Sequence, residues 1–268
     1  MVIRNPKTVR RPMAARGPIA APAWLTARPI AHRAYHDAAS GRMENTLSAV
    51  RAAIDRNFAI EVDLQMTADG AVVVFHDDTV DRLLQASGRV DTMTLASLKA
   101  TSFRQGGDTV PTLEELLETV AGKVPLVIEL KSNWDGNRRL EAAVAPILAA
   151  YAGPAVVMSF DPDSMAVMQW LLPSVPRGIV ADRYTDLDEW GHLGPRQRFA
   201  LRNLSAVPKV GASFVSYDLA GLPSFAPSKI RASGLPLITW TVRTREQAAK
   251  AQLYTDQITF EGFDPDEG

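Results

Sequence analysis

The chain of 268 residues contains no cysteine. Disulfide bonds, structural zinc sites built on thiolates and thiol nucleophiles are therefore all excluded. The chain also lacks a charge excess of either sign, with a formal net charge of −1 and a pI near 6.4, whereas a nucleic-acid-binding protein usually carries a basic face. No apolar run approaches the ~20 residues of a membrane-spanning helix. We therefore expect neither a nucleic-acid partner nor a transmembrane segment.

The first 28 residues are basic and rich in proline and alanine. They contain no continuous apolar stretch of the ~7 or more residues that a secretory signal requires. The Arg10-Arg11 pair is typical of a twin-arginine signal, but the apolar stretch that such a signal needs is missing. We predict that residues 1–28 form an N-terminal extension, mobile or packed, and that the protein is cytoplasmic.

Along residues 29–268, β-branched apolar runs alternate with helical patterns, which is typical of repeated βα units. The predicted strands are Pro29–His32, Ala59–Gln65, Leu126–Leu130, Ala155–Ser159, Arg177–Val180, Ser213–Tyr217, Leu237–Thr241 and Gln257–Phe260. The predicted helices are Thr46–Arg56, Thr112–Val120, Arg138–Ala150, Asp163–Leu172, Pro195–Leu204, Ser224–Ala232 and Arg245–Ala251. Thr112 and Glu115 form a capping-box pattern, and Pro162 suits a first helical turn. Eight strands and a length near the ~250 residues of such barrels predict an α/β fold, the (β/α)8 TIM barrel.

Two places depart from the regular repeat. The segment between Met66 and Pro111 is too long for an ordinary βα loop and predicts a small insertion at about residues 67–110. Within it we expect a hairpin that turns at Ala68-Asp69-Gly70, a strand at Val72–Phe75 and a short helix at Leu95–Ala100. Only eight residues follow the last predicted strand. An eighth helix is therefore absent, or the N-terminal extension covers that part of the barrel.

Two of the four histidines follow directly on predicted strands. These are His32 and His76, and catalytic residues of (β/α)8 barrels sit at such strand ends. An imidazole titrates near neutral pH, so two of them can serve as general acid and general base. A lone histidine at a strand end more often has only a structural, hydrogen-bonding role. The pair together with its acidic surroundings favours catalysis.

Three carboxylates lie on the predicted strands. Glu61 and Asp63 are two residues apart, so their side chains point to the same face of one strand, and Glu129 lies on another. Buried carboxylates are costly unless a cation compensates them, either a metal ion or a basic side chain in a structural ion pair. If a metal is bound, ligands that are all oxygen favour Mg²⁺ or Ca²⁺ over zinc.

In their order along the chain, these motifs resemble those of the glycerophosphodiester phosphodiesterase family. The matching segments are His32-Arg33, Glu44-Asn45-Thr46, Glu61-Val62-Asp63 with Thr67-x-Asp69-Gly70, His76-Asp77, Pro111-Thr112-Leu113-x-Glu115, Ile128-Glu129-x-Lys131 and Trp240-Thr241-Val242. The resemblance runs from about Pro29 to the C-terminus. It implies a metal-dependent enzyme that takes a small-molecule glycerophosphodiester and cleaves it to glycerol 3-phosphate and an alcohol.

The resemblance also implies a role for each matching residue. The implied roles are catalytic for His32 and His76, metal-binding for Glu61, Asp63 and Glu129, and substrate- or phosphate-binding for Arg33, Lys131, Glu44 and Trp240. One divalent cation, Mg²⁺ or Ca²⁺, is the expected cofactor. Glu44 would support the site by hydrogen bonding or a metal contact, or be only a first-turn acid favoured by the helix dipole. Which histidine is acid and which is base stays open.

Further residues near strand ends could shape the pocket. We assign Phe160, Tyr217 and Glu261 to the substrate pocket, Tyr35 and His36 to its entrance, and His192 to the surface. Many relatives have glycine where this chain has Ala34, which predicts a negative φ there or an altered loop.

Two other functions fit the same motifs. A lysophospholipase D acting on lysolipids would need an apolar entrance, which the segment Leu219–Phe225 could supply. A non-catalytic barrel that binds a phosphorylated metabolite would be marked by loss of a histidine or a carboxylate, and all are present. No sequence feature indicates the alcohol released or the oligomeric state.

Overall fold

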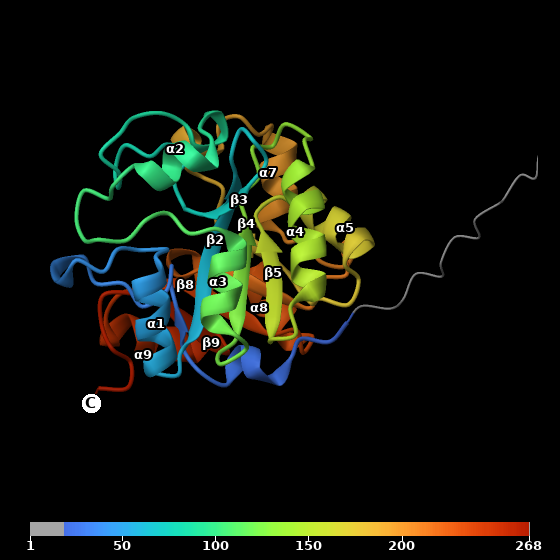
Figure 1. Cartoon of the computed structure of the whole chain (residues 1–268). Helices are drawn as coiled ribbons and strands as arrows, with labels where there is room; N and C mark the ends of the chain where they lie inside the picture. The colour runs from blue at the N-terminus through green and yellow to red at the C-terminus, as the bar shows by residue number, and fades with distance from the viewer. Residues whose placement is uncertain (1–18, 268) are drawn as a thin grey trace, which may run out of the picture.

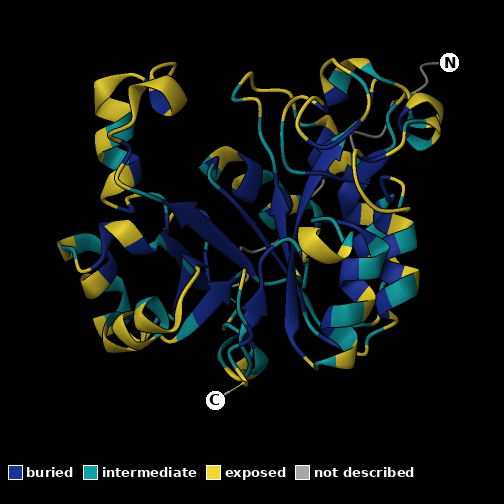
Figure 2. Ribbon diagram, turned by 90° about the vertical axis from the view of Figure 1, so that its left-hand side faces the viewer, coloured by how far each residue is buried: buried dark blue, intermediate teal, exposed yellow. Residues whose placement is uncertain are grey.

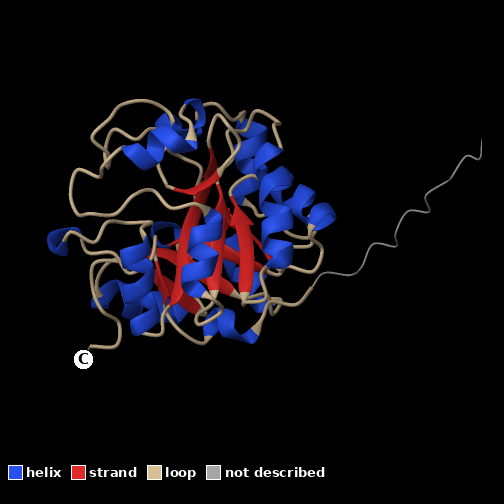
Figure 3. Ribbon diagram, viewed as in Figure 1, coloured by secondary structure: helices blue, strands red, loops and turns tan. Residues whose placement is uncertain are grey.

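Eight parallel strands close into a barrel that helices surround (Figures 1 and 3). The computed structural model describes residues 19–267, and the barrel strands within them are β1 (Ile30–Ala31), β2 (Ala59–Met66), β4 (Leu126–Leu130), β5 (Ala155–Ser159), β6 (Arg177–Ala181), β7 (Phe214–Asp218), β8 (Leu237–Val242) and β9 (Gln257–Phe260). The short β1 pairs with both β9 and β2, which closes the sheet. The predicted (β/α)8 barrel is confirmed, and each predicted strand end lies within one residue of the observed one.

Most of the helices pack outside the barrel wall, and the others lie at the end of the barrel where the strands finish (Figure 3). The helices are α1 (Leu47–Asp55), α2 (Leu95–Ala100), α3 (Leu113–Val120), α4 (Arg139–Ala150), α5 (Pro162–Leu171), α6 (Leu187–Trp190), α7 (Pro195–Arg202), α8 (Phe225–Ala232) and α9 (Arg245–Tyr254), with 3₁₀ turns η1 (Ala23–Thr26), η2 (Ala38–Ser40), η3 (Val90–Thr92) and η4 (Leu219–Gly221). The capping box at Thr112 and Glu115 is present, and Pro162 opens α5. The short α6 and the 3₁₀ turns were not predicted, because a single turn leaves no periodic pattern.

Two apolar layers hold the barrel together, and the strands between these layers are buried (Figure 2). One lies between the strands and the surrounding helices, and the other fills the barrel interior with side chains such as Val127, Val156 and Phe214. Leu25 of η1 belongs to the interior layer and is fully buried. The turn η1 thus packs against the end of the barrel where the strands begin. Residues 1–18 of the predicted extension, with the Arg10-Arg11 pair, lie outside the described residues.

Residues 67–110 form a lobe at the end of the barrel where the strands finish, at the upper left of Figure 1. The strand β3 (Val72–Val74) runs antiparallel to the end of β2, and α2 follows at the predicted residues. The lobe has its own small core, which includes Phe75, Leu84 and Phe103. No helix follows β9 in residues 261–267, and no helix in the described part of the chain is long and apolar enough to span a membrane.

Candidate active site

The ends of the barrel strands surround one pocket of about 840 Å³. Among the residues that line it are eight of the nine predicted site residues: His32, Arg33, Glu61, Asp63, His76, Glu129, Lys131 and Trp240. The ninth, Glu44, does not line the pocket; its carboxylate lies behind Arg33 and accepts a hydrogen bond from it over 2.7 Å. Catalytic groups of this fold gather at the same end of the barrel.

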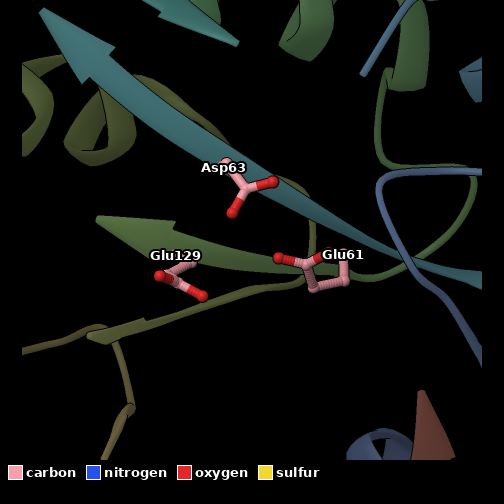
Figure 4. Close-up of side chains that lie close together, drawn as sticks. All are labelled: Glu61, Asp63 and Glu129. Carbon is pink, nitrogen blue, oxygen red and sulfur yellow. The ribbon is translucent and has the colours of Figure 1, made fainter. Parts of the chain in front are cut away.

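Three buried carboxylates point toward one another at the inner end of the pocket (Figure 4). Glu61 and Asp63 share one face of β2, and the strand register sets Asp63 beside Glu129 of β4. One oxygen from each residue lies within 4.8 Å of the others. Burial and the charges of Asp63 and Glu129 raise the pKa of Glu61 well above its usual value. This mutual repulsion and the all-oxygen donor set fit a hard divalent cation.

Basic and amide groups hold the three carboxylates in place. The Lys131 ammonium lies 3.0 Å from Asp63 and 2.9 Å from Glu129. Asn45, on the loop before α1, donates its amide to Asp63 over 2.9 Å. Burial raises the pKa of Asp63, but the charges of Lys131 and of its other cationic neighbours outweigh burial and keep this pKa below its usual value. Asp63 is therefore ionised, which a metal ligand must be.

The backbone after β1 also reaches this cluster. Arg33 and Ala34 have φ angles of 51° and 65°, and the Arg33 amide donates to the Glu61 carboxylate over 2.9 Å. Of the two alternatives expected at Ala34, a negative φ or an altered loop, the negative φ is therefore wrong. This conformation costs about 1–2 kcal/mol at each residue. The hydrogen bond that the Ala34 amide donates to the Glu61 carbonyl and the burial of the small side chain offset part of this cost.

His32 is held by a carboxylate from the other end of the chain. Its Nδ1 lies 2.5 Å from Glu261, which follows β9, and Arg243 donates to the other oxygen of Glu261 over 2.8 Å. Because a carboxylate accepts, Nδ1 carries the hydrogen and Nε2 of a neutral ring is left as the free acceptor. Burial lowers the pKa of His32 and outweighs the opposing effect of Glu261, so the ring is neutral near pH 7.

His76 is held in a similar way from the insertion. Its Nδ1 lies 2.8 Å from Asp77. Arg82, also in the insertion, binds both oxygens of Asp77 and both oxygens of Glu44 at 2.6–2.9 Å. Glu44 thus bridges Arg82 to Arg33. This chain of ion pairs ties the insertion to the barrel loop that carries Arg33.

Aromatic rings form the outer wall of the pocket. Trp240 and Phe160 contact at 5.6 Å between ring centroids, Phe160 and Trp190 at 5.2 Å, and Trp190 and Trp134 at 6.2 Å. His192 is exposed, as expected, but it also lines the pocket and lies 5.9 Å from Trp134. We refer to the rings of Trp134, Phe160, Trp190 and Trp240 as the aromatic wall.

Of the other residues assigned to the pocket or its entrance, some act on the pocket and some lie away from it. Phe160 lines the pocket, whereas Glu261 does not line it and instead contacts two lining residues, His32 and Arg243. Tyr217 is 1% exposed and belongs to the apolar layer between the strands and the helices, so it does not line the pocket. Tyr35 and His36 do not line the pocket either. Sequence reasoning missed Arg82, Trp134 and Trp190. The available signal for Arg82 was Asp77, a carboxylate next to His76 that needs a basic partner. Trp134 stands in a loop and Trp190 at the end of the single-turn helix α6, and neither has a local pattern that marks it.

Three comparisons with known proteins extend this picture. The model of the Glycerophosphoryl diester phosphodiesterase family matches residues 32–258. The Bacillus subtilis protein YhdW, whose name assigns it to the glycerophosphodiester phosphodiesterases, is 32% identical over 235 residues, which cover 83% of this chain and 89% of that protein. Glycerophosphodiester phosphodiesterase 1 of Bos taurus is 26% identical over 81% of this chain and 72% of its own length.

The fold has a solved counterpart as well. A phosphodiesterase of Oleispira antarctica, whose structure holds the product sn-glycerol-3-phosphate, superposes with a TM-score of 0.73 and 22% identity over 88% of this chain and 94% of that one. Such an identity supports the fold alone. The family model and the relative at 32% identity show the family: the chain belongs to the glycerophosphoryl diester phosphodiesterase family of phosphodiester hydrolases.

Proposed function

We propose that this enzyme hydrolyses glycerophosphodiesters to glycerol 3-phosphate and an alcohol and depends on one divalent cation, Mg²⁺ or Ca²⁺. The observation that carries the proposal is the convergence on one pocket of two carboxylate-held imidazoles and three buried carboxylates. Membership of the family and the product complex of the Oleispira antarctica relative support the substrate class.

In this proposal Glu61, Asp63 and Glu129 hold the cation. When bound, the cation supplies Lewis-acid polarisation of the phosphoryl group and neutralises charge that develops on its oxygens. Lys131 and Arg33 stabilise the negative charge on the same oxygens. Without a dication, the three carboxylates exceed these two basic groups by one negative charge. With it, the balance becomes positive and matches a phosphodiester monoanion.

The two imidazoles move the protons. His32 is neutral and offers Nε2, so it takes the proton from the attacking oxygen as the bond to phosphorus forms. His76, whose Nδ1 is held by Asp77, gives a proton from Nε2 to the departing alkoxide as the other phosphorus–oxygen bond breaks. Glu261 and Asp77 keep both rings in the correct tautomer and stabilise the charged form of each.

The test is release of glycerol 3-phosphate from glycerophosphodiesters, coupled to its dehydrogenase, with Mg²⁺, with Ca²⁺ and with a chelator. We expect release that a chelator abolishes, with turnover reduced roughly 10²–10⁴-fold in His32→Ala and in His76→Ala. Glu61→Ala should lose both activity and the stabilisation of the fold by added cation, read as a thermal shift. The matched control is Glu118→Gln, which changes an exposed carboxylate on α3.

Two outcomes would contradict the proposal. Turnover that is unchanged by a chelator, in a protein that contains no bound metal, would remove the role of the carboxylates. Near-wild-type turnover in the double variant His32→Ala/His76→Ala would remove the proton transfers.

A further inference from the structure

The aromatic wall joins the core of the fold to the pocket, with Trp190 in the core and the other three rings partly exposed. Its four rings come from four separate segments: Trp134 from the loop after β4, Phe160 from the end of β5, Trp190 from α6 and Trp240 from β8. All four line the pocket, and Trp134, Phe160 and Trp240 are only partly buried. These three rings therefore present surface to a ligand in the pocket, whereas Trp190 is covered.

The charge at this outer end of the pocket is negative. Glu189 and Asp135 line the pocket beside the aromatic wall. Partial burial raises the pKa of Glu189, and the charges of the nearby Asp182 and Asp186 add to this effect. Among the basic groups, Lys131 and Arg33 surround the inner end. Arg89 and Arg243 also line the pocket, but each is paired with a carboxylate, Arg89 with Asp91 and Arg243 with Glu261. The pocket is therefore polarised, with an inner end suited to phosphate and an outer end suited to a cation.

Trp190 supports the aromatic wall from behind. Its side chain is 4% exposed, and its indole N–H donates to Asp182 over 2.9 Å. The surface that a ligand meets therefore comes from Trp134, Phe160 and Trp240. Tryptophan is the best of the aromatic side chains at attracting a cation.

We propose that the outer end of this pocket is a subsite for a quaternary ammonium group, so that the enzyme prefers glycerophosphodiesters of choline-like alcohols. The proposal rests on the function proposed above and names the alcohol that it leaves open. A quaternary ammonium has no N–H, so it loses little by leaving water and gains most from ring faces and diffuse negative charge. A primary ammonium would lose its hydrogen bonds to water against the rings. A neutral group would gain nothing from Glu189.

An acyl chain is the rival occupant of an apolar surface. Aliphatic chains are bound by extended apolar grooves, and the carboxylates of Glu189 and Asp135 interrupt the surface here. The segment Leu219–Phe225, considered as an apolar entrance, contributes no residue to the pocket lining, and Phe225 is 81% exposed. The geometry therefore favours a compact cation over a lipid tail.

The experiment compares kcat/KM for four glycerophosphate diesters with the metal present. They are the choline ester, the ethanolamine ester, the 3,3-dimethylbutyl ester, which has the shape of choline without its charge, and lysophosphatidylcholine. We expect the choline ester to exceed the dimethylbutyl ester by roughly 2- to 30-fold, the range of a cation–aromatic interaction. Trp134→Leu and Glu189→Gln should each bring this ratio toward one, and Trp134→Phe should keep part of it.

Trp170→Leu is the matched control, because Trp170 on α5 is 80% exposed and lies outside the pocket. Equal kcat/KM for the choline and dimethylbutyl esters, or a preference for the lysolipid that Trp134→Leu abolishes, would overturn the proposal. If no diester is hydrolysed, the proposed function fails separately. The subsite is then tested by calorimetric titration with tetramethylammonium: binding that Trp134→Leu removes supports it, and no binding to the wild-type protein overturns it.

Discussion

The hydrogen bond between Glu261 and His32 offers the sharpest test of how the site works. Both side chains are largely buried, at 18% and 11% exposure, and their atoms are 2.5 Å apart. A charge-assisted hydrogen bond of this kind contributes about 1.5–3 kcal/mol. If His32 accepts the proton from the attacking oxygen, that energy stabilises the imidazolium that forms in the transition state. Glu261→Ala should therefore lower kcat by about 10- to 100-fold, with little change in KM.

The pH profile gives an independent reading of the same contact. Glu261 raises the pKa of His32 through its hydrogen bond and its charge, against the lowering by burial. Its removal should lower this pKa further, so the acid limb of the kcat/KM profile should move to lower pH while the maximum falls. The assay is the coupled release of glycerol 3-phosphate across pH, with Glu118→Gln as the control. An unchanged acid limb, or a loss confined to KM, would refute the assignment of Glu261 as the positioning residue of His32.

Three further predictions concern the stability of the fold. Burial raises the pKa of Asp77, but hydrogen bonds from His76 and Arg82 outweigh this and hold the pKa below its usual value. Asp77→Asn should therefore cost about 1–2 kcal/mol at pH 7. In urea titrations this cost should begin to shrink as the pH falls below the usual aspartate pKa, and it should disappear only below the lower pKa that Asp77 has in the folded protein. Gly178→Ala would place a Cβ 2.4 Å from the Phe214 ring inside the barrel, so urea unfolding should show a loss of about 1–3 kcal/mol, and an unchanged midpoint would contradict that packing. Leu25→Ala should cost about 2–5 kcal/mol in the same assay; a cost near zero would mean that η1 does not support the barrel interior.

The strands could be predicted closely because of where they lie. In a parallel barrel both faces of each strand are covered, so the strands appear in the sequence as short, nearly continuous apolar runs. The same regularity explains the acidic cluster. Glu61 and Asp63 had to share a face, since strand side chains alternate, and Glu129 interrupts an apolar strand that is otherwise buried. For such residues the local pattern carries the three-dimensional information.

Contacts between segments that are distant in the sequence could not be predicted from local patterns. Glu261 was assigned to the substrate pocket, but its pairing with His32 joins residues 229 positions apart and depends on β9 lying beside β1. Arg82 is one of many charged residues in a long insertion, and only the fold sets it against Glu44. The negative φ expected of Ala34 was wrong because alanine, with only a Cβ, tolerates the left-handed region at small cost when backbone bonds compensate.

The link between Arg82 and Glu44 has a consequence for protein engineering. Lobes with their own core are attractive modules for exchange between related enzymes, and this insertion looks separable by that criterion. Yet the guanidinium of Arg82 in the insertion completes a chain of ion pairs that ends at Arg33, beside the carboxylate cluster. A chimaera that takes the lobe from a relative without an equivalent arginine would leave Glu44 with an uncompensated charge and His76 with a looser partner. Grafting should therefore treat Arg82 and Glu44 as one inherited unit.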